Sequence, residues 1–372
     1  MGDLDVNDLD VLCSALRPTL MGGSRPADAG WDGTLRLAAA HDLLPALWSA
    51  GRAHDWWAAL PPDALAQVVA RFAPGTTQPP LVLQQAHDAN RRRVADLSDQ
   101  GQVILEHLAS AGIVAVPLKG LHVLMAGWWP DPADRVMRDL DILVSKDDAG
   151  RASQCLAGLG YLPFTTGHTA AADHELPAVA LPGRAGSVEL HTALVVSRWS
   201  AVLPAAEILD RGPLMTSTDA VIHSIAHAQL HDEAHLLARI PLRALHELMI
   251  LAAGPRGQEI DWARVRSSFR KVSAEAALDA HLCQARSLFG ASVPPPVGLF
   301  RPVAHDRLCR TLLGRPGLAS MYERTAFLPR GLSTERMHEL HGPGSPWISR
   351  SRHVAHALHR MARSRRTNAG SA

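Results

Sequence analysis

Two aspartates, Asp139 and Asp141, stand two residues apart at the start of the apolar run 142–144. Alternate residues of a β-strand point to the same face, so a strand here would aim both carboxylates at one place. Paired carboxylates supply the hard oxygen ligands that Mg²⁺ prefers, and Mg²⁺ usually arrives with nucleotide phosphates. The spacing therefore predicts a metal-dependent site that acts on phosphates.

The surroundings of this pair distinguish it from two others with the same spacing. Asp-Leu-Asp also occurs at residues 3–5 and 8–10, in an acidic leader with no apolar strand behind it. We interpret those pairs as a solvated start of the chain and a helix cap. Asp139 and Asp141 instead follow the turn Lys119-Gly120 and the basic Arg135. A lysine and a helix N-terminus in such an order can meet phosphate oxygens.

The elements that must position these residues can be predicted from periodicity and breakers. Residues 1–95 are predicted to be helical, and a long helix is expected from Asn90 to Gly112. The predicted strands and helices that follow are a strand at 113–117, a helix at 121–125, a buried strand at 139–144, a helix ending near Gly158, strands at 161–165 and 187–192, and helices from 218 to 290. Residues 298–372 give only short helical signals.

Composition limits the classes of function. The chain has 372 residues, 47% hydrophobic and 20% charged, with a net charge of +1, so nothing in the overall charge supports binding to RNA or to a membrane surface. The four cysteines are widely spaced and form no Cys-x-x-Cys, which argues against a zinc ribbon or a disulfide framework. Because we find no secretory signal and no apolar run of about 20 residues, we expect a cytoplasmic protein without a membrane span.

Several short segments together resemble a known family. They are Leu118-Lys-Gly120, Arg135 with Asp139-Leu-Asp141, Leu159-Gly-Tyr161, Val188-Glu-Leu-His191, Val221-Ile-His223 with His227, and Ile260-Asp-Trp262. Across about residues 35–290 the chain is similar to the uncharacterised nucleotidyltransferase family of the polymerase-β-like superfamily. The resemblance implies an α+β fold whose core is a mixed sheet flanked by helices. We place a helical N-terminal region at 1–95, the core at 96–212, a helical C-terminal domain at 213–292 and a basic, partly disordered tail at 293–372.

The resemblance also implies roles for individual residues. Asp139 and Asp141 would be catalytic metal ligands, with Glu189 as the third carboxylate at a position where aspartate is commoner. Lys119 and Gly120 stand where most of the superfamily carries Gly-Ser, and would bind the nucleotide phosphates together with Arg135. Arg138 is a weaker candidate for the triphosphate contact, because its charge would also offset the aspartates. Asp173 and Glu175 are weaker substitutes for Glu189. His191, His223 and His227 are candidates for the lining of the pocket.

The activity that follows is transfer of a nucleotide from an NTP, with ATP as the expected donor, to an acceptor hydroxyl. Two Mg²⁺ ions, or Mn²⁺ in their place, would serve as cofactors. The acceptor is open among a small molecule, a peptide, a protein and RNA. Residue usage suits a bacterium, and the family resembles accessory enzymes of peptide natural products. Two alternatives stay open: a kinase-like phosphotransferase acting on a peptide, and an inactive binding or scaffold protein of the same fold.

Four histidines recur at four-residue steps: His223, His227, His231 and His235. Such spacing predicts one shared helical face over about three turns. The glutamate of a His-Glu-x-x-His zinc site is missing, so we favour a polar helix face or a pocket lining over a metal site. A second histidine-rich stretch at 353–361 is interpreted as part of a solvated basic tail rather than a surface for RNA or membrane.

Overall fold

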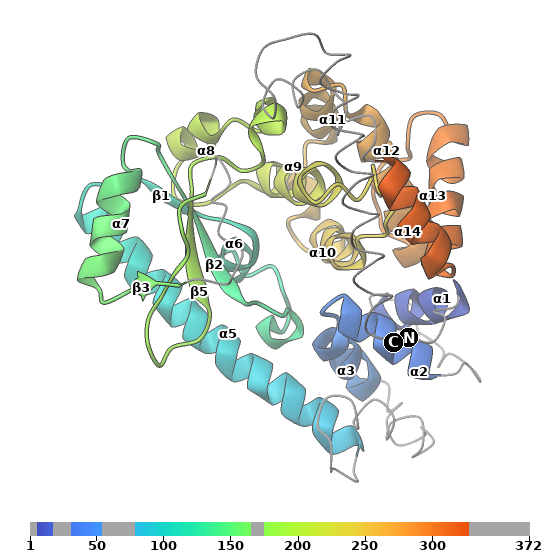
Figure 1. The fold of residues 1–372 in the computed structure, drawn as a ribbon, viewed down its shortest axis with the longest axis horizontal. Helices are drawn as coiled ribbons and strands as arrows, with labels where there is room; N and C mark the ends of the chain where they lie inside the picture. The colour runs from blue at the N-terminus through green and yellow to red at the C-terminus, as the bar shows by residue number, and fades with distance from the viewer. Residues whose placement is uncertain (1–5, 18–30, 54–78, 165–174, 327–372) are drawn as a thin grey trace, which may run out of the picture. The chain divides into compact units, whose positions relative to one another are not determined.

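The computed structural model describes residues 6–17, 31–53, 79–164 and 175–326, which form an α+β structure (Figure 1). The chain divides into two compact units, residues 1–314 and residues 315–372. The helices are α1 Val6–Leu16, α2 Trp31–Ala40, α3 Leu44–Ala53, α5 Pro79–Ser110, α6 Lys119–Met125, α7 Ala149–Gly158, α8 Ala205–Arg211, α9 Ser217–Ala226, α10 Leu242–Ala253, α11 Trp262–Lys271, α12 Glu275–Phe289, α13 Phe300–Leu313 and α14 Pro316–Ala326. The strands are β1 Ala115–Pro117, β2 Asp139–Val144, β3 Leu162–Pro163, β4 Val179–Ala180 and β5 Ser187–His191.

The first unit contains a five-stranded mixed sheet with the order β1-β2-β5-β4-β3. The central pair β2 and β5 is parallel, and the other pairs are antiparallel. In the parallel pair Asp139 lies beside Ser187 and Asp141 beside Glu189. The predicted α+β class with a mixed sheet flanked by helices is confirmed.

One face of β2 and β5 packs into the hydrophobic core. Leu140, Ile142 and Val144 alternate with the aspartates and are fully buried, as are their neighbours on β5. They pack with apolar side chains of α5 and α7, which lie beside the sheet in Figure 1. The period of two in the strand therefore commits Asp139 and Asp141 to the opposite face.

Two helical segments differ from their predicted extent. The long helix α5 begins at Pro79 rather than near Asn90, because proline is well tolerated in the first turn of a helix, where its missing N–H would have no partner. Residues 300–313 form α13, whose buried Cys309 and Leu312 face α12, although only short helical signals are found in this segment of the sequence. The domain boundaries stay predictions, and α5 runs through the first of them.

The histidine ladder is regular only in part. Helix α9 ends at Ala226 and continues as a π-helical turn, His227–His231, after which the helix stops. The His227 and His231 rings stack with centroids 4.5 Å apart, whereas His235 stacks on His305 of α13. The prediction of one face for all four histidines is therefore wrong, because the helix ends before His235.

No helix among the described residues is long and apolar enough to cross a membrane. The aspartate pair at residues 3–5, Asp173 and the basic stretch from residue 327 onward lie outside the described residues.

A buried histidine in the helical region makes stability depend on pH. His281 on α12 is fully buried and accepts a hydrogen bond from Gln229 Nε2 at 2.8 Å. Burial lowers the pKa of His281 from 6.5 to about 3. Between these two pH values the unfolded chain binds a proton that the folded chain does not, so stability falls as the pH falls.

We expect His281→Gln to flatten this dependence, because the amide oxygen can accept the Gln229 bond without titrating. Urea unfolding between pH 6.5 and 4.5 should show the wild-type free energy falling more steeply, by about 1.4 kcal/mol per pH unit at the acid end. Parallel pH curves for the two proteins would contradict this assignment.

Candidate active site

Three carboxylates lie on the face of the sheet that is turned away from the core. Asp139 and Asp141 point to this face from β2, and Glu189 of β5 pairs in register with Asp141. Ligand atoms of Asp141, Glu189 and His191 lie within 4.8 Å of one another. The parallel pairing of β2 with β5 therefore brings together residues that are 48 positions apart in the chain.

The Asp141 carboxylate is the most enclosed of the three, with 3% of its side chain exposed. Its Oδ1 accepts hydrogen bonds from Lys119 Nζ at 2.7 Å and from His191 Nε2 at 2.8 Å. The other nitrogen of His191, Nδ1, lies 3.6 Å from Glu175 Oε1. Glu175, considered only as a substitute for Glu189, thus stands on the far side of His191 from the aspartate.

Lys119 is held in place by an unusual backbone. Its φ is +45°, in the left-handed region that costs a non-glycine residue of order 1 kcal/mol or more. The preceding Leu118 N–H donates to the Asp141 carbonyl at 2.9 Å, which ties the start of α6 to β2. Strand and helix therefore fix the lysine ammonium over the aspartate.

Gly120 is required by close packing. A Cβ atom at this position would overlap Arg135 Nη1 and lie 2.9 Å from Met137 Cγ. The family resemblance implies that Gly120 helps to bind the nucleotide phosphates; in the structure this glycine makes room for the arginine and methionine side chains. A substitution at Gly120 would push Arg135 or α6 away.

The electrostatic balance of the site is negative. Burial, and then the neighbouring Asp141, raise the pKa of Asp139, and burial followed by Asp141 and Asp139 raises the pKa of Glu189. Burial also opposes ionisation of Asp141, but Lys119 and His191 outweigh it and hold the pKa of this carboxyl well below its ordinary value. Lys119 thus faces three carboxyl groups that repel one another, with Arg135 and Arg243 as further positive charges near Asp139.

A divalent cation fits this donor set. Carboxylate oxygens are the ligands of Mg²⁺ and Mn²⁺, and a bound cation would relieve the repulsion that raises the pKa values of Asp139 and Glu189. A carboxylate oxygen of Glu189 lies within 4.8 Å of one of Asp141 on the neighbouring strand, which is close enough for both to bind one ion. Among the described residues, Asp141, Glu189 and His191 have ligand atoms close enough to share one ion, and Asp139 lies on the same face of the sheet.

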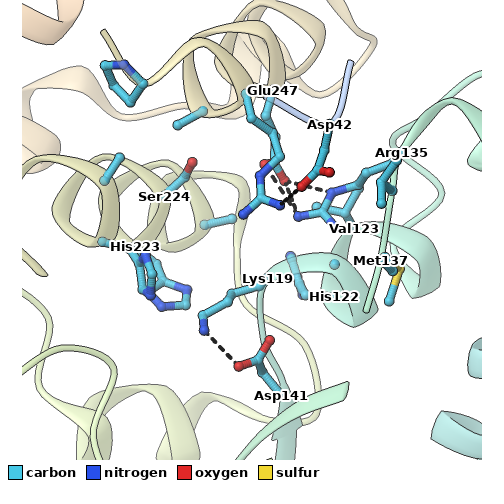
Figure 2. Close-up of a pocket in the computed structure, with 18 of the residues that line it drawn as sticks. Asp42, Lys119, His122, Val123, Arg135, Met137, Asp141, His223, Ser224 and Glu247 are labelled. Atoms are coloured by element: carbon cyan, nitrogen blue, oxygen red, sulfur yellow. Dashed lines mark hydrogen bonds and ion pairs between the residues drawn. The ribbon is translucent and has the colours of Figure 1, made fainter. Parts of the chain in front are cut away.

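A cavity of about 490 Å³ opens in front of the aspartates (Figure 2). Its walls come from α6, the segment 135–141, α9 with the π-helical turn, α10, and the turn at residues 40–42. Lys119 and Asp141 lie on one side of it, while Asp42, Arg135 and Glu247 lie on the other. This volume is in the range of small-molecule sites.

Two of the predicted histidines line the cavity. His223 is buried on α9, and among the described residues its Nε2 has no hydrogen-bond partner. Burial, and then His227 and Lys119, lower the pKa of His223 well below its ordinary value. His227 Nδ1 lies 3.2 Å from Asp232 Oδ2, and both residues line the cavity. His191, predicted as a lining residue, instead binds Asp141 within the sheet.

Arg135 lies at the cavity, but its guanidinium is committed to a protein partner. Nε and Nη2 both donate to Glu247 Oε1 on α10 at 3.3 Å. Both side chains are nearly enclosed, with 8% of Arg135 and 10% of Glu247 exposed. The predicted contact of Arg135 with a triphosphate is thus in competition with a buried ion pair.

A comparison with known protein families identifies the family of this chain. A family model described as "Uncharacterised nucleotidyltransferase" matches residues 27–290 of the 372-residue chain. The chain belongs to this family. No curated protein matches it. Membership confirms the resemblance read from the motifs, supports nucleotidyl transfer as the general chemistry and implies an NTP substrate.

In this member of the family, residues of the sequence motifs form one wall of the cavity, whereas much of the other wall comes from residues outside those motifs. Asp42, Arg243 and Glu247 also line it, from the turn after α2 and from α10. Each stands outside any motif, and no local spacing marks it. Only the packing of α10 and of this turn against the core brings them to the carboxylates.

Proposed function

We propose that this chain transfers a nucleotide from an NTP, with ATP as the expected donor, to a hydroxyl group of an acceptor molecule. The observation that carries the proposal is the convergence of Asp141 and Glu189 on neighbouring parallel strands, with Asp139 on the same face, in front of a cavity that also holds Lys119. A negative cluster beside a half-buried lysine suits a metal-bound triphosphate better than a neutral substrate.

In the proposed reaction the acceptor oxygen attacks the α-phosphorus, the bond to the bridging oxygen breaks, and pyrophosphate leaves. Bound Mg²⁺ would neutralise the triphosphate and lower the pKa of the acceptor hydroxyl. Lys119 Nζ, now on Asp141, would neutralise phosphate oxygens as a point charge. Glu189, whose pKa is raised by burial and by the two aspartates, would take the proton from the attacking hydroxyl.

The test is a labelling experiment on the full chain. ATP, GTP, CTP and UTP carrying label at the α- or γ-phosphorus are incubated with the protein, Mg²⁺ or Mn²⁺, and pools of small molecules, peptides or RNA. We expect pyrophosphate release and α-label on an acceptor, both abolished by EDTA. Transfer of the γ-label instead would identify the phosphotransferase alternative, and absence of both would favour the scaffold.

A further inference from the structure

Two arginines at the cavity share a single carboxylate. Arg138 Nη2 donates to Asp42 Oδ1 at 2.6 Å, and Arg243 Nη1 donates to Asp42 Oδ2 at 3.4 Å. The three residues come from the segment before β2, from α10 and from the turn between α2 and α3. All three line the cavity that contains Asp139 and Asp141.

The charges of this group do not balance. Two guanidinium groups face one carboxylate, so the group keeps an excess positive charge at the edge of a negative site. The arginine side chains are more than half exposed, whereas 20% of Asp42 is exposed. Guanidinium groups match the oxygens of phosphate as well as those of a carboxylate, and a terminal phosphate carries more negative charge than Asp42.

We propose that Arg138 and Arg243 form the subsite for the terminal phosphates of the nucleotide, and that the Asp42 carboxylate occupies this subsite when no nucleotide is bound. The inference rests on the proposed function and assigns the phosphate contacts within the same cavity. It differs from the expectation from the sequence, in which Arg135 binds the triphosphate and Arg138 mainly offsets the charge of the aspartates.

Three observations support the assignment to this pair, and the first of them distinguishes it from Arg135. The Arg135 guanidinium is buried against Glu247, while those of Arg138 and Arg243 are accessible. Arg138 and Arg243 line the same cavity as Asp139 and Asp141, so the subsite borders the proposed metal ligands. Asp42 has a φ of +57° in a short turn, a conformation that directs its carboxylate to the arginines at a cost in backbone strain.

The proposal predicts that removing a negative charge tightens the binding of an anion. Asp42→Asn frees both arginines, so affinity for inorganic tripolyphosphate and for ATP should rise about threefold to tenfold, the range expected for displacing two partly exposed ion pairs. Arg138→Gln and Arg243→Gln should each weaken the same binding by a similar factor. Calorimetry in EDTA, on the full chain, measures both ligands without metal or turnover.

The chain offers a matched control. Glu233 accepts from Arg198 at 2.6 Å, has 19% of its side chain exposed and also has a positive φ, but it does not line the cavity. Glu233→Gln should leave tripolyphosphate affinity unchanged. Thermal unfolding of each variant excludes loss of the fold, and the exposed Arg138 tests the subsite even if Asp42→Asn is unstable.

The proposal is overturned if Asp42→Asn binds tripolyphosphate no more tightly than Glu233→Gln, if both arginine variants keep wild-type affinity, or if the wild type binds neither ligand. A different failure concerns the proposed function alone. If the affinities change as expected but no NTP yields pyrophosphate, the phosphate subsite stands and nucleotidyl transfer falls.

Discussion

Asp141→Asn is expected to lower the rate of nucleotidyl transfer by at least about a thousandfold, equivalent to roughly 4 kcal/mol of transition-state stabilisation. The substitution removes one charge from the group that would hold the metal, and it removes the anionic partner of both Lys119 and His191. Pyrophosphate release from the preferred NTP measures the effect.

Two further variants separate catalysis from stability. Glu189→Gln changes a carboxylate that is more exposed than Asp141 and has no bond to Lys119, so it should reduce transfer with little change in unfolding temperature. Asp10→Asn tests whether Asp-Leu-Asp spacing alone matters for activity, because residues 8–10 on α1 repeat this pattern. Asp10 pairs with Arg310, so the variant also removes an ion-paired carboxylate. Its activity should equal that of the wild type. Full activity of Asp141→Asn would rule out the carboxylate site.

The part of the site that the sequence could predict is the part built from local patterns. Alternation of Asp139 and Asp141 with Leu140 and Ile142 defined both the strand and its two faces, since period two is a property of the backbone. The turn at Lys119 was marked by its glycine. Pairing of Glu189 with Asp141 depends on which strands become neighbours, and only the family resemblance indicated it.

The remaining contacts could not be predicted because they depend on how distant elements pack. Arg135 and Glu247 are 112 residues apart, and Arg243 and Asp42 are 201 apart. No periodicity relates such positions, and a charged residue on a helix most often faces solvent. The π-helical turn after α9 was not predicted for a different reason. The four-residue spacing of the histidines is equally compatible with a helix that continues and with one that stops.

Glu247→Gln is expected to destabilise the first compact unit by about 3–5 kcal/mol, the usual cost of leaving one member of a buried ion pair without its partner. Arg135 would keep its charge with 8% of its side chain exposed, among Gly120, Met137 and the amide that replaces Glu247. Urea unfolding followed by circular dichroism measures this loss, with Glu233→Gln, a less buried ion-paired glutamate, as the control.

The double variant Arg135→Met with Glu247→Leu should recover much of the lost stability, because it removes both buried charges and fills a similar volume. It should nevertheless weaken catalysis. The ion pair joins the segment before β2 to α10, and the Arg135 guanidinium packs against Gly120, next to Lys119. A stable but slow double variant would show that the pair positions α10 and the lysine over the carboxylates. Additive losses of stability in the two single variants and the double variant would contradict a direct coupling between Arg135 and Glu247.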